Sequence, residues 1–424
     1  MMKKQANACL PNSTTEPTWF KAYRQQALQA SATLARPVFE RIDYHRWPIA
    51  LQQFDQATSS LEDTAISSDL YQDNTFVWTN KHTQWCQLAQ KWQAQGVIMC
   101  DWHTALTKHA DLIQKYYGKT VKWDENQLTA QHAAWMQGGL FIYVPRNVQV
   151  TEPLVSYLIQ DARTTADFVP HVLIVAAENS SLTYLENLQT IGSKEATANI
   201  IVEVVARPGS HVNFASSDRL GPNTTAYLNR RATVERDARI DWSMGMMNDG
   251  NTVGDFDSDL VGNGAHAEVK IVAMTSAKQV QGIDSRVTNK APNTIGHILQ
   301  HGVILGKSQL IFNGIGHILH GAKGADAQQE SRVLMLSKQG RGDANPILLI
   351  DDNDVTAGHA ASVGRIDEEQ MYYLMSRGLS KELAERLVIR GFLGPVLNKI
   401  PDKHTLTTLE KVCEQKLIEG QKNA

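Results

Sequence analysis

Three groups of side chains in this sequence have types and spacings that suit chemistry. The first is an acidic triplet, because Asp255, Asp257 and Asp259 alternate in the segment GDFDSDL. On a strand they would share one face at intervals of about 7 Å, and they would repel one another unless solvent or a cation neutralised them. A β-helix enzyme that cleaves sugars could hold calcium in this way. A solvated outer face is the alternative and the commoner explanation.

The second group consists of histidines. The segment IGHIL occurs twice, 20 residues apart, and places His297 and His317 at equivalent positions; His301 and His320 follow nearby. If the repeat stacks His297 over His317 on adjacent coils, the two imidazoles could share a metal ion, as in a metal-binding protein. A surface pair of histidines is the alternative.

The third candidate is His359. It lies in the segment 343–392, whose first third alternates apolar and polar residues like a strand and whose remainder has helical spacing. We therefore predict that Thr356 to Ala360 form a turn where the pattern changes. An imidazole titrates near neutral pH and can bind metals, but in such a turn it is more often solvated or bonded locally.

The composition limits the class of protein. The chain has 424 residues, of which 42% are hydrophobic and 20% charged, and its formal net charge is −3. These values predict a globular protein of two or three structural units without a nucleic-acid surface. No apolar run is long enough to span a bilayer, and the N-terminus lacks the apolar region of a secretory signal. We therefore expect a cytoplasmic protein that binds neither membranes nor nucleic acid.

Cysteine is scarce. Cys9, Cys86, Cys100 and Cys413 are the four cysteines, and no two form a C-x-x-C pair. This pattern predicts neither a disulfide framework nor a zinc site. The chain cannot by itself supply the four thiolates that an ordinary iron–sulfur cluster uses.

The N-terminal part is predicted to be mostly helical and irregular. Apolar residues recur at helical intervals in 19–35, 83–95 and 102–117, and a Pro or Gly follows shortly after each segment.

From about residue 137 the pattern changes to short strands separated by turn residues. Five segments share a turn residue, a small residue and then an alternating strand pattern. Their small residues are Ser180, Ser210, Ala238, Ala265 and Ser308, at intervals of 30, 28, 27 and 43. Strands that return in this way without intervening helices predict a parallel β-helix. A β-sandwich is the alternative, but its turns would recur about every 8 to 12 residues.

The C-terminal part is predicted to form three short helices. Asp367 can cap the first and Gly378 can end it; Ser380 can cap the second and Gly391 can end it. The third covers about 406–418. Their apolar positions could hold a partner, although packing against the β-helix is the simpler explanation.

These patterns together predict a mainly β protein in three parts. We expect an N-terminal helical region over 1–130, a β-helix core over 131–360 and a C-terminal helical domain over 361–424.

The segment 343–392 resembles the SufB/SufD family, the scaffold proteins of the Suf iron–sulfur cluster assembly system. The motifs that carry the resemblance are Asn345-Pro346, Asn353-Asp354-Val355, Ala357 to Gly364, Asp367-Glu368-Glu369 and Tyr373-Leu374-Met375-Ser376-Arg377-Gly378. Similar segments at Gly139 to Pro145, Leu173 to Glu178, Phe312 to Gly314 and Ala325 to Arg332 extend it to about residues 135–395. Because it has few cysteines, the sequence resembles the branch of the family that lacks the assembly cysteines.

The resemblance implies a right-handed parallel β-helix between helical ends, and a scaffold rather than an enzyme. It implies a heterodimer with a SufB-like subunit and docking of the SufC-like ATPase on about residues 365–424. ATP hydrolysis would belong to that partner, because this sequence has no G-x-x-x-x-G-K-[ST] loop. The isolated chain could also form a homodimer through its unpaired strands.

The resemblance also assigns a role to His359. This residue stands where the family's Cys-x-His motif places a histidine at the subunit interface, so it would be this chain's metal ligand to a transient iron–sulfur cluster shared with the partner. The family's cysteine is Ala357 here, which limits the contribution to one imidazole, and we expect no cofactor bound tightly by the isolated chain. At the partner interface the resemblance further places Asp354, Val355, Tyr373, Ser376, Arg377 and Gly378.

Overall fold

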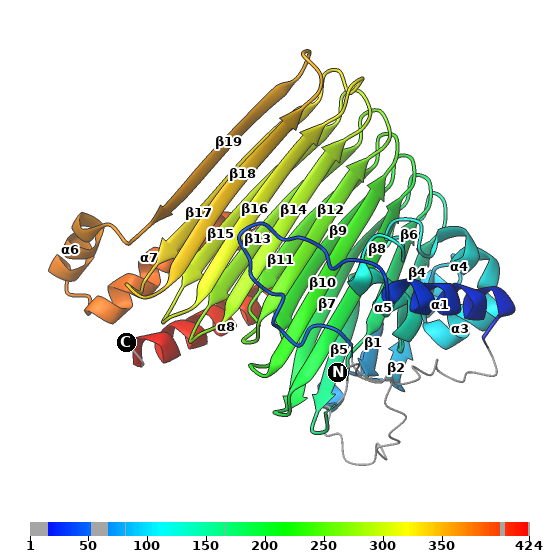
Figure 1. The fold of residues 1–424 in the computed structure, drawn as a ribbon, viewed down its shortest axis with the longest axis horizontal. Helices are drawn as coiled ribbons and strands as arrows, with labels where there is room; N and C mark the ends of the chain where they lie inside the picture. Colours follow the sequence, from blue (N-terminus) through cyan, green and yellow to red (C-terminus); the bar gives the residue numbers. More distant parts are fainter. Residues whose placement is uncertain (1–15, 52–66, 81, 166, 399–402, 423–424) are drawn as a thin grey trace.

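The computed structural model describes residues 16–51, 67–80, 82–165, 167–398 and 403–422. Its centre is a parallel β-solenoid of about eight turns between residues 138 and 364 (Figure 1). Each turn contributes one strand to each of two sheets, so strands that follow one another in the sequence lie in opposite sheets. The predicted parallel β-helix between helical ends is therefore confirmed.

We name the two sheets A and B and give their strands in spatial order. Sheet A contains β19 (Thr356–Gly364), β17 (Asp326–Met335), β15 (Ile295–Ile304), β13 (His266–Thr275), β11 (Arg239–Met246), β9 (His211–Arg219), β7 (Ser181–Gly192), β5 (Leu154–Ala162), β1 (Thr75–Thr79) and β2 (His82–Gln87). Sheet B contains β18 (Arg341–Ile350), β16 (Gln309–Ile318), β14 (Val280–Asn289), β12 (Thr252–Leu260), β10 (Thr224–Val234), β8 (Ala196–Ala206), β6 (Pro170–Ala176), β4 (Gly138–Val144) and β3 (Ile98–Asp101).

A repeated turn stacks the coils. Before each of the strands β7 to β17 of sheet A stands a residue with φ between 54° and 73°, whose N–H donates to a carbonyl of the next coil. Glycine, and after it Asn and Asp, adopt this left-handed conformation at the least cost. The residues are Asn179, Gly209, Asp237, Gly264, Asn293 and Gly324.

One interval of the predicted repeat was wrong. Ser308, placed 43 residues after Ala265, precedes β16 of sheet B, whereas the other four small residues precede strands of sheet A. The positions that continue the repeat are Thr294 and Ala325, which follow the turn residues Asn293 and Gly324. A serine before a strand gives the same local pattern in either sheet. The sequence pattern therefore did not distinguish a strand of sheet A from a strand of sheet B.

Aromatic side chains stack along the solenoid interior. Tyr184, Phe214 and Trp242 occupy register positions on β7, β9 and β11 and are at most 2% exposed. Their ring centroids are 5.3 and 4.7 Å apart in succession. The rings stack because successive coils place equivalent residues one above another. They belong to one apolar core that runs through the coils.

A buried ion cluster interrupts this apolar core. The Arg230 guanidinium donates two hydrogen bonds to Asp218, of 2.9 and 2.7 Å, and one of 2.6 Å to Glu186. All three side chains are at most 1% exposed. Burial raises the pKa of Glu186 although the Arg230 guanidinium lowers it, and the nearby Asp218 carboxylate adds to the increase. The cluster therefore depends on the arginine to compensate two carboxyl groups inside the solenoid.

N-terminal helices pack against the outer face of sheet B. They are α1 (Thr18–Ser31), α3 (Trp102–Lys108), α4 (Ala110–Tyr116) and α5 (Gln127–Trp135). A 3-10 helix (Ser68–Leu70) precedes β1, and α2 (Gln90–Gln93) precedes β3 and buries Trp92 in the interior core of the solenoid. The helix predicted over 83–95 was wrong in its first half, because residues 82–87 form β2 and pair with β1. The helix predicted over 102–117 is present but divides at His109.

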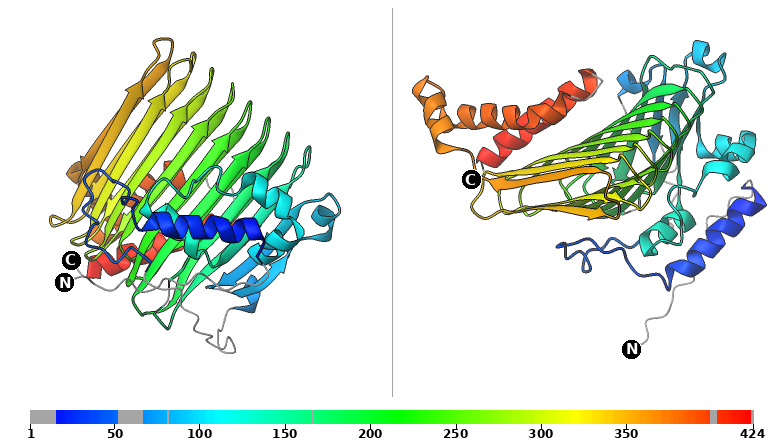
Figure 2. Two further views of the ribbon diagram at one scale, coloured as in Figure 1. Left: turned by 45° about the vertical axis from the view of Figure 1, so that its right-hand side comes forward. Right: turned by 90° about the horizontal axis from the view of Figure 1, so that it is seen from above.

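The C-terminal helices lie on the opposite side of the solenoid from the N-terminal ones (Figure 2). They are α6 (Glu368–Ser376), α7 (Lys381–Leu397) and α8 (Lys403–Lys422). The predicted N-caps are confirmed, since Asp367 and Ser380 each accept from main-chain N–H groups of the first turn. The predicted end at Gly391 was wrong: α7 continues because Leu393 and Val396 are buried against sheet A. No helix in the described part of the chain is long and apolar enough to cross a membrane.

Candidate functional site

The last coil of the solenoid consists of two edge strands. β19 pairs with β17 and β18 pairs with β16, and each is the last strand of its sheet among the described residues. The turn predicted for Thr356 to Ala360 is wrong, because these residues are extended in β19. Apart from His359 these residues have small side chains, and main-chain pairing with β17 decides their conformation.

His359 belongs to the inner face of this strand. The parallel register pairs Ala357 with Ala327 and His359 with Gln329, and both residues of β17 are buried. Residues paired in this way point to the same side of a sheet. His359 is nevertheless exposed, because no described residue forms a further coil over it. Its imidazole thus stands at the open end of the solenoid interior.

Apolar side chains surround this end. Leu349 and Ile350 at the end of β18 are 45% and 44% exposed, and Val363 of β19 is 41% exposed. Of the predicted interface residues, Asp354 lies in the turn before β19, where its carbonyl accepts from Gly324 N–H at 2.6 Å. Val355 packs partly against the small cluster beneath that turn. Unpaired strand edges with apolar side chains are suited to strand pairing with another chain.

The described cysteines lie away from His359. Cys86 and Cys100 belong to β2 and β3 at the other end of the sheets, and Cys413 belongs to α8. Burial raises the pKa of Cys100 and of Cys413 to about 12, so both thiols are protonated at neutral pH. None of these sulfur atoms belongs to the coil that carries His359.

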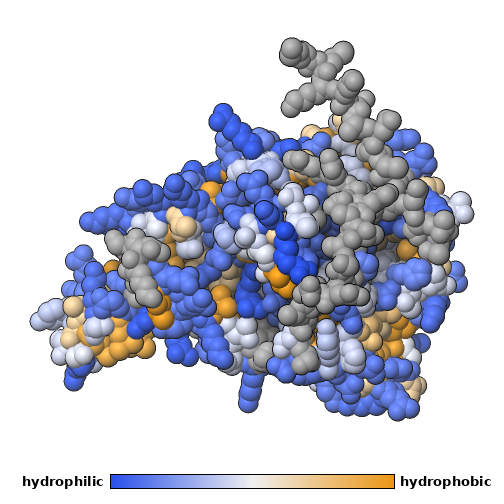
Figure 3. Space-filling view, turned by 90° about the horizontal axis from the view of Figure 1, so that it is seen from below, coloured by the Kyte–Doolittle hydropathy of each residue, from blue (hydrophilic) through white to orange (hydrophobic). Residues whose placement is uncertain are grey.

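A second exposed region lies on α6, in which no residue is buried. We call it the α6 surface: Tyr372 (76% exposed), Tyr373, Met375 and, from α7, Leu383 and Leu387. Figure 3 shows hydrophobic side chains gathered at the end of the molecule that carries these helices.

The remaining predicted interface residues lie within or beside the α6 surface. The Arg377 guanidinium lies 5.3 Å from the centre of the Tyr373 ring, and the Ser376 hydroxyl donates to the Tyr373 carbonyl at 2.7 Å. Gly378 has a φ of 92° and ends the helix. The structure thus separates the predicted interface residues into two places, the turn before β19 and helix α6.

The acidic triplet is neutralised by the protein's own cations. Asp255, Asp257 and Asp259 share the outer face of β12, as predicted. Arg231 lies 3.3 Å from Asp257 and 3.7 Å from Asp255, and Lys290 lies 2.9 Å from Asp259. Burial, followed by repulsion from Asp255, raises the pKa of Asp257. These contacts favour the structural explanation of the triplet over a calcium site.

The predicted stacking of His297 over His317 is wrong. His297 lies in β15 of sheet A and His317 in β16 of sheet B, because 20 residues carry the chain to the opposite sheet. His301 is buried against α7, where its Nδ1–H donates to the Phe392 carbonyl at 2.7 Å. His320 is exposed. Residues that stack on one sheet are about 30 positions apart. The repeat of IGHIL after 20 residues therefore does not bring its two histidines together.

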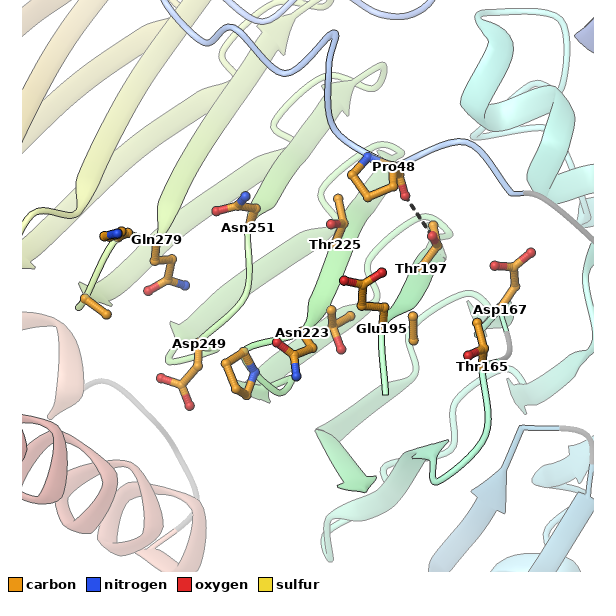
Figure 4. Close-up of a pocket in the computed structure, with 15 residues that line it drawn as sticks. Pro48, Thr165, Asp167, Glu195, Thr197, Asn223, Thr225, Asp249, Asn251 and Gln279 are labelled. Carbon is orange, nitrogen blue, oxygen red and sulfur yellow. Dashed lines mark hydrogen bonds between the residues drawn. The ribbon is translucent and has the colours of Figure 1, made fainter. Parts of the chain in front are cut away.

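A large groove lies elsewhere. It has a volume of about 790 Å³ and follows the turns that precede β8, β10, β12 and β14 (Figure 4). Polar side chains line it, among them Asn223, Asn251 and Gln279, and the Thr197 hydroxyl donates to the Pro48 carbonyl at 2.8 Å. It contains none of the predicted site residues, and no motif in the sequence pointed to it.

Comparison with known proteins identifies the family. The family described as "SUF system FeS cluster assembly, SufBD core domain" matches residues 158–392, and the "SufBD protein N-terminal region" matches residues 68–155. The chain is 44% identical over 415 residues to "Iron-sulfur cluster assembly protein SufD" of Bacillus subtilis (strain 168), covering 95% of both chains.

More distant relatives agree. The chain is 28% identical over 315 residues to an "Iron-sulfur cluster assembly SufBD family protein" of Staphylococcus epidermidis, covering 74% of this chain and 68% of that protein. It is 25% identical over 415 residues to a SufBD family protein of Staphylococcus aureus (strain MRSA252), covering 94% and 89%. The chain therefore belongs to the SufBD family of the SUF iron–sulfur cluster assembly system, and within it to the non-catalytic SufD type.

Proposed function

We propose that this SufD-type chain pairs with a SufB-like subunit through the last coil of its solenoid and presents His359 to an iron–sulfur cluster forming between the two subunits. The observation that carries the proposal is the position of His359 on the inner face of an uncovered edge strand. A partner that continued the sheets from β18 and β19 would enclose the imidazole.

The chemistry divides the ligands between the two chains. Imidazole is a suitable ligand for iron, but iron–sulfur clusters are held mainly by thiolates. Ala357, two residues before His359, has no ligand atom, and the described cysteines belong to other parts of the fold. The partner would therefore provide the thiolates, and the cluster is cargo that this chain helps to assemble rather than a resident cofactor.

The α6 surface is proposed to bind the SufC-like ATPase. No residue of α6 is buried, so its two exposed tyrosines and its exposed methionine do not stabilise the fold of this chain. Exposed apolar side chains that lie together in this way are typical of protein interfaces. His359 and this surface lie on neighbouring segments, so movement of the ATPase could reach the cluster site through the short connection from β19 to α6.

Co-expression with a SufB-like and a SufC-like protein, followed by size exclusion, tests the proposal. We expect the three chains to elute together, and we expect this chain alone to elute as a monomer or as a homodimer joined at the same edge strands. A chain that elutes alone in the presence of both partners would contradict the proposed assembly.

A further inference from the structure

Two histidines and a glutamate converge on the outer face of sheet A. They are His266 and Glu268 of β13 and His297 of β15, which stands in register with Glu268. One donor atom from each lies within 4.8 Å of the other two, and among the described residues this is the one such group of three or more His, Cys, Asp or Glu. None of them contacts the last coil, so the group is separate from the site proposed for cluster assembly.

The three donor atoms lie close to one another. Glu268 Oε1 lies 2.9 Å from His266 Nε2 and 3.0 Å from His297 Nδ1. A tetrahedral zinc ion with bonds of about 2.0–2.1 Å holds its ligands about 3.3 Å apart. The two distances from Glu268 Oε1 are close to this value, and the two imidazole nitrogens lie within 4.8 Å of each other, so a metal ion requires them to turn toward a common centre. They are 18% to 33% exposed, which leaves a fourth position open to water.

Asp326 supplies the outer partner that metal-bound imidazoles usually have. Its Oδ2 accepts from His297 Nε2 at 3.2 Å, on the ring nitrogen away from Glu268. A carboxylate in this position orients the ring and keeps the proton on Nε2, which leaves Nδ1 free for a metal. The Asp–His pair of such an arrangement is thus already present in the fold.

Two cations compete with a metal ion. Lys270 donates to Glu268 Oε2 at 3.0 Å and leaves Oε1 available. Arg239 Nη1 lies 3.3 Å from His266 Nδ1, which must act as the acceptor because a guanidinium only donates. A metal at Nε2 requires a proton on Nδ1, so Arg239 must release this contact. Its two bonds to Asp241, of 2.7 and 2.8 Å, leave it with a partner when that contact is lost.

We propose that His266, Glu268 and His297 form a site for a divalent first-row transition metal ion such as zinc. Two imidazoles and one carboxylate are the ligand set that zinc and ferrous iron use in sites with an open position. Binding displaces the protons that now lie between the imidazoles and Glu268, so the affinity falls at acid pH.

Zinc titration of the untagged full chain by calorimetry tests this site, with cobalt(II) absorption reporting the coordination number. We expect one tetrahedral or five-coordinate site, and we expect His297→Ala and Glu268→Gln each to weaken zinc binding at least about tenfold. Asp326→Asn should weaken it about 10- to 100-fold, as loss of an outer partner does. Arg239→Gln, which removes the competing donor, should tighten it.

Two control variants make the result specific. His103→Ala removes an exposed imidazole of α3, on the opposite side of the solenoid from His266 and Glu268 (Figure 2). His359→Ala removes the imidazole at the solenoid end. Neither should change the affinity. The inference is overturned if the wild-type chain binds no zinc, or if His297→Ala binds it as tightly as wild type. Loss of zinc binding in His359→Ala alone would overturn it while supporting a metal at the other site.

Discussion

His359 of β19 lies in register with Gln329 of β17, and both side chains belong to the inner face of the solenoid. Gln329 is 5% exposed, and its Oε1 has no hydrogen-bond partner among the residues that the structure describes. His359 stands one coil further along and is exposed. The two residues therefore mark the boundary between the filled interior and an end that a partner can cover.

We expect His359→Ala to impair cluster assembly without affecting the fold. An exposed side chain contributes little to stability, so the free energy of unfolding should change by no more than about 0.5 kcal/mol. Loss of a ligand should lower the yield of clusters in the reconstituted three-chain complex at least about tenfold. Absorption of the assembled cluster measures this yield. His82→Ala, an exposed histidine in β2, is the control, and equal yields from both variants would contradict the role of His359.

A charge on the edge strand should prevent pairing with the SufB-like subunit. Val363 in β19 and Val261 in the turn after β12 are 41% and 42% exposed, but only Val363 lies at the solenoid end. We expect Val363→Glu to weaken the heterodimer at least about tenfold, because a buried unpaired carboxylate is costly. Val261→Glu should leave the dissociation constant unchanged. Equal affinities of the two variants in analytical ultracentrifugation would exclude this edge as the interface.

The α6 surface allows a similar comparison. Tyr372 on α6 and Val38 near the N-terminus are 76% and 77% exposed. Interface tyrosines often contribute more than 1 kcal/mol to binding, so Tyr372→Ala should weaken binding of the SufC-like ATPase about fivefold or more. Val38→Ala should have no effect. If surface plasmon resonance shows the ATPase binding both variants like wild type, it docks elsewhere.

Removal of Arg230 should destabilise the solenoid severely. Arg230→Met leaves Glu186 and Asp218 buried without a cation, which costs about 3–5 kcal/mol of unfolding free energy. Arg332→Ala removes an arginine that is half exposed and bound to Glu330 at 2.7 Å, and it should cost no more than about 1 kcal/mol. Urea denaturation followed by circular dichroism measures both. Arg230→Lys keeps the charge but loses the paired hydrogen bonds, and we expect an intermediate value; similar midpoints for Arg230→Met and Arg332→Ala would contradict the stabilising role.

Asp284 should make the protein less stable as the pH rises. Burial raises the pKa of Asp284 to about 7, against the bond from Asn313, and nearby Asp255 adds to the effect. The folded protein then retains a proton that the unfolded chain loses above about pH 4, so this group's contribution to stability falls between about pH 4 and pH 7.

The substitution Asp284→Asn should remove this dependence. We expect the variant to exceed wild type by at least about 1 kcal/mol at pH 8 and to match it near pH 4. Asp237→Asn, at a side chain that is 70% exposed, should have the same small effect at both pH values. Urea denaturation at the two pH values measures the difference, and an equal effect of Asp284→Asn at both would show that the carboxyl group is ionised throughout.

Local patterns in the sequence determined the solenoid and its helix ends. Each coil of sheet A begins at a residue that tolerates positive φ, and such residues are visible as Asn, Asp or Gly at intervals near 30. Asp367 and Ser380 cap their helices through bonds to main-chain groups two or three residues away. Interactions this short depend on the nearby sequence alone, and the family motifs around His359 are equally local.

The tertiary structure alone decided which side chains meet. His297 and His317 share a motif but lie in opposite sheets, whereas His297 meets Glu268, 29 residues earlier, because the two strands pair in register. His359 lies on an open edge rather than in a turn because β17 provides its backbone partners. In a parallel sheet the register follows from the lengths of whole coils, and a shift by one residue would reverse the face of every side chain. No local pattern contains that information.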